Sequence, residues 1–176
     1  MALNEAANSD AALVQAARAG DRLAFGALYE RYARIVHGIM LAHAPPYVAD
    51  DLVQDVFERA LRQIPKLRDS NAFSGWLIAI ARNRAHDHHR RSKQTDELQD
   101  IARAERVSSH SEAAAALEAI RQLPETYRET LLLRLVEGLT GPEIAARTGL
   151  KHESVRVNLH RGMKMLREAL SLSRKR

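Results

Sequence analysis

The sequence predicts an all-α fold in which two small helical domains are joined by a flexible linker. Aromatic residues make up only 5% of the 176 residues, and alanine, leucine and arginine dominate, a composition that favours helices over β-sheet. Apolar residues recur every three or four positions along most of the chain, as they do on one face of a helix. This periodicity is lost in a polar stretch, which divides the chain into domains at 10–92 and 112–172 and a linker at 93–111.

Two helices are expected to open the first domain. Ser9 or Asp10 can cap a helix that runs to Ala19, because a short polar side chain can accept a hydrogen bond from an early helical N–H. Asp21 can cap a second helix in the same way. Pro45–Pro46 should stop that second helix, since the residue before a proline is forced out of the helical conformation.

A third helix is expected at about 48–64, with an apolar face on one side. The opposite face gathers acidic and amide residues, namely Asp51, Gln54, Asp55 and Glu58. By itself such a face is most simply a solvated surface. The whole chain carries a net charge of +5, so a compact acidic face beside basic ones also indicates two kinds of partner.

A fourth helix is expected from about 71–74 to Arg91, after a loop that begins at Pro65. Phe73 and Trp76 should face a core. The polar side carries Arg82, Asn83, His86, Asp87, Arg90 and Arg91. Two interpretations remain open: the cations complement the dipole at the helix end, or they bind phosphates while amide and imidazole groups contact base edges.

The fourth helix also raises the question of a metal ion. His86 and His89 lie one helical turn apart, which is a suitable spacing for two ligands. The arginines at 82, 84, 90 and 91 would repel a cation, however. We therefore expect no metal ion, and nothing in the sequence indicates a cofactor.

The second domain should begin with two further helices. Helical periodicity returns at Glu112 and stops at Pro124, and the next helix runs on until Gly138. Then Thr140 is placed to cap a short helix at 141–148, with Glu143 completing a capping box and Gly149 able to take the left-handed conformation that ends helices.

The last helix follows this turn from about Lys151. One side is apolar, and the other carries Arg156, His160, Arg161 and Lys164. A short helix, a glycine-bearing turn and a longer helix with a basic face predict a helix-turn-helix, which lays its second helix in the DNA major groove. The alternative is a helical hairpin whose charged face is merely solvated.

Composition and missing motifs exclude several classes of protein. The absence of cysteine excludes disulfides and cysteine-ligated zinc. No apolar run approaches the roughly 20 residues that a membrane span needs, and the first residues lack the order of a signal peptide, so a cytoplasmic location is expected.

An enzyme is not expected either. The sequence contains no Ser/His/Asp set, glycine-rich phosphate loop or HExxH motif. Glu125 and Glu129 lie one helical turn apart, but they have no histidine nearby in the sequence and look like a solvated face.

The chain resembles bacterial sigma factors of the extracytoplasmic-function group, the compact members that have only regions 2 and 4. Four segments carry the resemblance in the order of the family: ADDLVQDVFERAL at 49–61, FSGWLIAIARNRAHDHHRR at 73–91, LPETYRETLLLRLVEGLTGPEIAARTGL at 123–150 and SVRVNLHRGMKMLRE at 154–168. The resemblance implies a factor that binds core RNA polymerase, recognises the −10 and −35 promoter elements and assists promoter melting. A stand-alone helix-turn-helix regulator is the alternative.

The resemblance also implies a role for each face. The residues expected to bind the β′ clamp helices of core polymerase are Asp51, Gln54, Asp55 and Glu58. The residues expected at the −10 element are Lys66, Asn71, Phe73, Trp76, Arg82, Asn83, His86, Asp87, Arg90 and Arg91. The residues expected at the −35 element are Lys151, His152, Glu153, Ser154, Arg156, His160, Arg161 and Lys164. The second domain should also contact the β-flap, and an anti-sigma protein is an expected partner.

Overall fold

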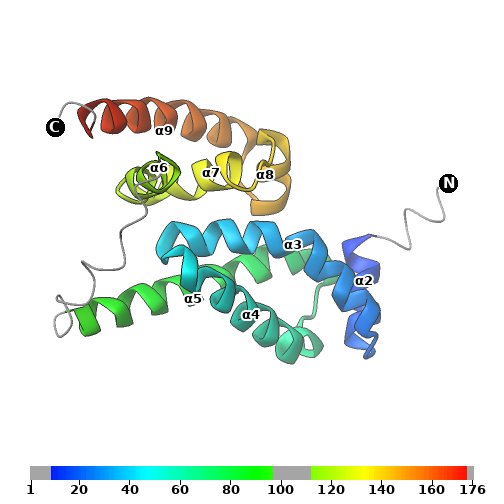
Figure 1. The fold of residues 1–176 in the computed structure, drawn as a ribbon. Helices are drawn as coiled ribbons and strands as arrows, with labels where there is room; N and C mark the ends of the chain where they lie inside the picture. Colours follow the sequence, from blue (N-terminus) through cyan, green and yellow to red (C-terminus); the bar gives the residue numbers. More distant parts are fainter. Residues whose placement is uncertain (1–8, 97–111, 174–176) are drawn as a thin grey trace.

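The structure is a computed structural model that describes residues 9–96 and 112–173, and within these residues all regular secondary structure is helical. The N-terminal domain consists of α2 (Asp10–Arg18), α3 (Arg22–His43), α4 (Pro46–Gln63) and α5 (Phe73–Asp96), with 3₁₀ turns at Ile64–Lys66 and Ser70–Ala72. The C-terminal domain consists of α6 (Glu112–Arg121), α7 (Glu125–Leu135), α8 (Gly141–Thr148) and α9 (His152–Ser173). The predicted all-α class is confirmed (Figure 1).

Helix α3 is the centre of the N-terminal domain, because α2, α4 and α5 all pack against it. Its capping residue is the predicted one: the Asp21 side chain accepts hydrogen bonds from the backbone N–H groups of Leu23 and Ala24. Leu28 and Ile35 on α3 are fully buried, as is Val56 on α4. The apolar faces that the sequence predicts for these helices therefore pack together in one core.

Helix α7 occupies the corresponding place in the C-terminal domain. Three consecutive residues, Leu131, Leu132 and Leu133, are all fully buried, so the helix must be covered on more than one side. Helix α9 covers one side at very short range, since a Cβ added at Gly162 would lie 3.0 Å from Cδ1 of Leu131. Helix α3 of the other domain covers another side.

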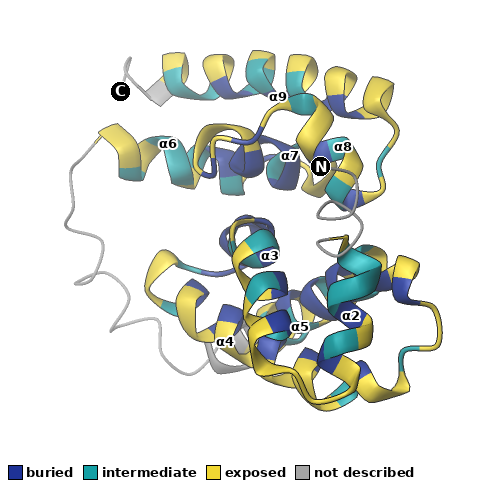
Figure 2. Cartoon of the chain, turned by 90° about the vertical axis from the view of Figure 1, so that its right-hand side faces the viewer, coloured by how far each residue is buried: buried dark blue, intermediate teal, exposed yellow. Residues whose placement is uncertain are grey.

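The two domains thus pack directly on each other (Figure 1), with α7 against α3 and α8 against α5. A Cβ added at Gly38 on α3 would lie only 2.6 Å from Cδ2 of Leu133 on α7, so the glycine permits the close approach. Figure 2 shows buried residues concentrated on α7 and along α3. We call this contact between α3, α5, α7 and α8 the interdomain interface.

Three details differ from the sequence predictions. Helix α4 begins at Pro46, because proline is tolerated in the first turn of a helix, where its missing N–H has no partner to lose. The helical spacing of apolar residues along 48–64 places Leu61 on the apolar face of that helix, but Leu61 is 49% exposed. Helix α5 continues to Asp96, so the predicted linker at 93–111 begins within a helix, and the rest of that linker lies outside the described residues.

Candidate functional site

The acidic face of α4 is exposed, as the sequence predicted. Asp51, Gln54, Asp55 and Glu58 all lie on the solvent side of the helix. Arg84 of α5 donates two hydrogen bonds to Oδ2 of Asp55, at 2.6 and 3.0 Å, and so orients this carboxylate. Exposed Leu61 lies one turn beyond Glu58, which gives this acidic face an apolar end.

The polar face of α5 is only partly as expected. Asn83, His86, Arg90 and Arg91 are exposed, as are Lys66 and Asn71 before the helix, and Trp76, Arg82 and Asp87 are half-buried. Phe73 is fully buried, with its ring 5.4 Å from that of Tyr32 and 5.8 Å from that of Trp76. The prediction that Phe73 belongs to a DNA surface is therefore wrong, because the ring is held inside an aromatic cluster of the core.

Helix α7 covers part of the α5 face. The guanidinium of Arg82 donates to both carboxylate oxygens of Glu129, at 2.7 and 3.2 Å, and this pairing raises the pKa of Arg82. Nε2 of His86 lies 3.3 Å from Oε1 of Glu125. Glu129 is only 8% exposed, so the expectation of a solvated face is corrected for Glu129, which meets α5 at the interdomain interface, whereas Glu125 is exposed beside His86.

The helix-turn-helix forms as its sequence predicts. The Thr140 hydroxyl accepts from the backbone N–H of Glu143 at 3.4 Å, and the Glu143 carboxylate accepts from the backbone N–H of Thr140 at 2.7 Å. These two hydrogen bonds are the predicted capping box. The Thr140 hydroxyl also donates to the Glu143 carboxylate at 2.7 Å, and this bond, together with the one from the Thr140 N–H, holds the pKa of Glu143 below its usual value. Gly149 ends α8 with φ +73°, which a side chain would strain.

All the residues expected to contact the −35 element are exposed, on α9 or on the residue before it. These residues are Lys151, His152, Glu153, Ser154, Arg156, His160, Arg161 and Lys164. The opposite side of α9 is anchored by Val155 and Leu166, which are buried against the domain. Figure 1 shows α9 on the side of its domain that lies away from α3, so the interdomain interface leaves this face open.

Polar contacts also cross the interface at sites that the sequence did not indicate. Nδ1 of His37 on α3 lies 2.6 Å from Oε1 of Glu137, which follows α7, and this contact raises the pKa of His37. Arg128 on α7 donates to the carbonyl of Ala42 at 2.8 Å. His37 and Glu137 are 100 residues apart in the chain, and Ala42 and Arg128 are 86 apart, so local sequence patterns cannot predict either contact.

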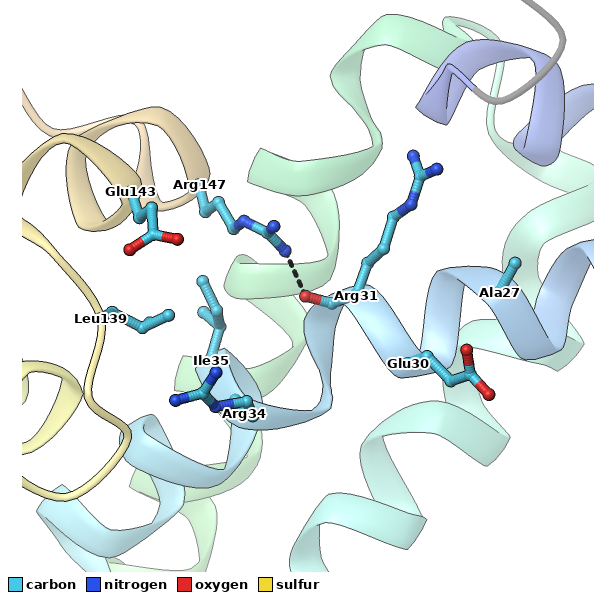
Figure 3. Close-up of a pocket in the computed structure, with 8 residues that line it drawn as sticks. All are labelled: Ala27, Glu30, Arg31, Arg34, Ile35, Leu139, Glu143 and Arg147. Carbon is cyan, nitrogen blue, oxygen red and sulfur yellow. Dashed lines mark hydrogen bonds between the residues drawn. The ribbon is translucent and has the colours of Figure 1, made fainter. Parts of the chain in front are cut away.

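A polar cleft of about 420 Å³ lies where α8 approaches α3. In Figure 3 the guanidinium of Arg147 on α8 points across the cleft and donates to the main-chain carbonyl of Arg31 on α3. The same guanidinium lies 5.8 Å from the centre of the Tyr32 ring, a distance suited to a cation–π contact. The first helix of the helix-turn-helix is therefore tied to the N-terminal domain.

One buried histidine also escaped the sequence analysis. His43 ends α3 and is 8% exposed, and burial lowers the pKa of its imidazole to about 4. Within the described part of the chain its Nε2 has no hydrogen-bond partner, and it lies 3.5 Å from Oε1 of Glu125. Neutral His43 thus meets His86 and Glu125 where α3, α5 and α7 converge.

Comparison with known proteins identifies the family to which this arrangement of helices belongs. Residues 28–95 match the family model "Sigma-70 region 2", and residues 113–166 match "Sigma-70, region 4". The chain is 33% identical to the ECF RNA polymerase sigma factor BldN of Streptomyces coelicolor, covering 94% of this chain and 69% of that protein. It is 31% identical to the RNA polymerase sigma-H factor of Pseudomonas aeruginosa, covering 92% and 93%.

Solved structures agree with the family models. The chain resembles CnrH in its complex with the cytosolic domain of CnrY, with 26% identity, a TM-score of 0.62 and coverage of 93% of this chain and 97% of CnrH. The fold is also that of RpoE from Bartonella quintana, solved with the anti-sigma factor NepR, at 24% identity, a TM-score of 0.51 and coverage of 82% and 93%.

The chain belongs to the extracytoplasmic-function group of the sigma-70 family. It is thus a sigma factor, which directs RNA polymerase to promoters, and sigma factors are not enzymes. Within the part of the chain that the structure describes, no helix combines the length and the apolar character that a membrane span needs.

Proposed function

We propose that three polar helix faces have separate roles in promoter recognition. The acidic face of α4 docks on the β′ clamp helices of core polymerase. The face of α5, with Lys66 and Asn71 before it, binds the −10 element, and the exposed face of α9 binds the −35 element. The observation that supports this division best is that all eight proposed −35 residues are exposed on, or directly before, the second helix of a capped helix-turn-helix.

Charge supports the same assignment. Phosphates attract Lys and Arg, and recognition helices read bases with their N-terminal residues, where His152, Glu153 and Arg156 lie on α9. Lys151, Arg161 and Lys164 can bind phosphates along the same groove. On α5 the −10 set is now Lys66, Asn71, Trp76, Arg82, Asn83, His86, Asp87, Arg90 and Arg91, without Phe73.

Promoter binding requires the interdomain interface to open. Arg82 is held by Glu129, and His86 lies against Glu125, so α7 covers two residues that the −10 element would need. Extruding and reading a base requires direct access to the α5 face. The arrangement described here is therefore a closed form, and the bound form has α7 moved away from α5.

The remaining partners follow from the same assignment. The C-terminal domain, 112–172, contacts the β-flap, while 10–92 carries the polymerase and −10 surfaces and 93–111 joins the two. A cognate anti-sigma protein is proposed as the regulator, and the complex of CnrH with the cytosolic domain of CnrY supports a protein partner for this fold. The factor itself catalyses nothing and acts in the cytoplasm, where polymerase and promoter meet.

Reversing one charge on α4 tests the polymerase contact. Asp51→Arg is preferred to a change at Asp55. Asp55 forms an ion pair with Arg84, so replacing Asp55 would alter that ion pair as well as the proposed polymerase contact. We expect Asp51→Arg to reduce co-elution with core polymerase at least tenfold, since it places a cation where the clamp helices meet carboxylates. Size-exclusion chromatography of the purified proteins measures the complex.

The matched control is Glu30→Arg, which makes the same charge change on an exposed residue of α3. It should leave assembly unchanged. If Asp51→Arg assembled as well as wild type, or if both variants lost assembly equally, α4 would not be the polymerase-binding face.

A further inference from the structure

We propose that His43, His86 and Glu125 form a site for a transition-metal dication of the Zn²⁺ class, with one ligand from each of α3, α5 and α7. The ligand atoms, two imidazole nitrogens and a carboxylate oxygen, all lie within 4.8 Å of one another. Two ligands belong to the N-terminal domain and one to the C-terminal domain, so a bound metal would join the domains.

The spacing of the three atoms fits tetrahedral coordination. Zinc binds nitrogen and oxygen at about 2.0–2.2 Å, so two ligand atoms of a tetrahedral site lie about 3.4 Å apart. Oε1 of Glu125 lies 3.5 Å from Nε2 of His43 and 3.3 Å from Nε2 of His86. Two of the three separations match this value, and the third, between the two imidazole nitrogens, is within 4.8 Å.

His43 supplies the independent sign of a ligand. Its side chain is only 5% exposed, and its Nε2, which points toward Glu125, is buried and has no hydrogen-bond partner among the described residues. A buried polar atom normally has a partner, because leaving it unsatisfied is costly. A metal ion between His43 and Glu125 would satisfy this nitrogen.

The arginines whose positive charge was expected to repel a metal ion are largely neutralised by carboxylates. Arg82 pairs with Glu129 at 2.7 Å, Arg84 with Asp55 at 2.6 Å and Arg90 with Asp87 at 3.2 Å. The imidazole of His89, which the sequence paired with His86, is not needed for this site. Two imidazoles and one carboxylate with a water in the fourth position is a ligand set that zinc accepts and that magnesium does not favour.

Metal binding would hold the factor closed. A ligand that binds one of two conformations shifts the equilibrium toward it by its difference in affinity. The three ligands meet only while α7 lies against α3 and α5, and His86 is also a proposed −10 residue. The metal and the −10 element would therefore compete for the same side chain.

Equilibrium dialysis of the full chain against Zn²⁺, after treatment with a chelator, tests the site. We expect one Zn²⁺ per chain, and affinity at least about tenfold weaker in His86→Ala and in Glu125→Gln, because each removes a ligand. Both residues are exposed, so both variants should fold. His160→Ala, an exposed histidine on α9, is the matched control and should bind as wild type does.

A second measurement follows the separation of the two domains. Arg59→Cys and Arg167→Cys, on exposed positions of α4 and α9, allow two dyes to be attached to a chain that has no cysteine of its own. Zn²⁺ should raise energy transfer in this labelled chain and not in its Glu125→Gln form, and Mg²⁺ should do neither. Zn²⁺ binding that is absent, or equal in wild type and both ligand variants, would overturn the proposal. Neither assay contains polymerase or DNA, so such a failure would leave the proposed promoter contacts untouched.

Discussion

Arg82 and Arg156 show how two arginines proposed to bind DNA differ in their surroundings. Arg82 is half-buried and bound to Glu129, so any DNA contact must first break a bidentate ion pair. Arg156 is exposed near the start of α9 and is available at once. Binding at the −35 element should consequently be less sensitive to domain opening than binding at the −10 element.

Arg156→Ala should weaken use of a promoter that depends on its −35 element. A bidentate arginine–guanine contact contributes about 1–3 kcal/mol of discrimination, so run-off transcription should fall roughly tenfold or more. Binding to core polymerase without DNA should not change. Arg167→Ala, three turns further along α9, is the control and should have a smaller effect. Equal loss of polymerase binding and transcription in Arg156→Ala would contradict the assignment.

His37 makes the interdomain interface sensitive to pH. Glu137 raises the pKa of His37 above its ordinary value of 6.5, with Asp50 adding to the effect at 3.7 Å and Arg34 lying 4.0 Å from Glu137. Because the folded pKa is raised, the stabilisation is fully present below pH 6.5 and is lost as the pH rises through the folded pKa.

Thermal unfolding of wild type and His37→Gln at several pH values between about 6 and 8 checks this sign. The advantage of wild type over the variant should shrink as the pH rises. A difference that stays constant across this range would show that His37 does not bind Glu137 in its protonated form.

At the scale of the helices, the sequence predicted what depends on local chemistry. Ser9, Asp21 and Thr140 cap the helices that follow them, and Gly149 takes the left-handed conformation, because these effects act over three or four residues. The exposed faces of α4 and α9 were predicted for the same reason: helical periodicity alone decides which residues share a side.

The interdomain interface could not be predicted in this way. His43 and His86 are 43 residues apart in the chain and Glu125 follows His86 by 39, and only the packing of α3, α5 and α7 brings them together. Glu129 looked solvated because its partner, Arg82, lies 47 residues away. Phe73 was assigned both to the core and to DNA, and its burial removes the second role.

Gly38 provides a test of the interface at the scale of one helix. Gly38→Leu should force α7 away from α3, because even a Cβ at this position would lie 2.6 Å from Leu133 and 3.2 Å from Cγ of Glu137. Replacing a helical glycine also favours the helix by up to about 1 kcal/mol, so α3 itself should remain folded.

Gly26→Leu is the matched control, since a Cβ at that position on the same helix meets nothing within 4 Å. Small-angle scattering should show a larger radius of gyration for Gly38→Leu than for wild type or Gly26→Leu. Equal radii for all three proteins would mean that Gly38 does not govern closure in solution.

For the whole molecule, the two domains differ in how far the closed form exposes their DNA-binding surfaces. The α9 face is open while α7 covers part of the α5 face, so the closed form can present only one of the two promoter surfaces. Opening costs the buried contacts of Leu133 and the ion pairs of Arg82 and His37, and polymerase and promoter together must offset that loss.

Locking the interface with a disulfide shows whether transcription requires the two domains to separate. The chain has no cysteine, and a Cβ at residue 38 would lie 3.3 Å from Cγ of Leu133, so Gly38→Cys combined with Leu133→Cys places two thiols within bonding range. Run-off transcription with core polymerase should be lost in the oxidised double variant and restored when the disulfide is reduced. Full transcription by the oxidised protein would contradict the claim that the domains must part.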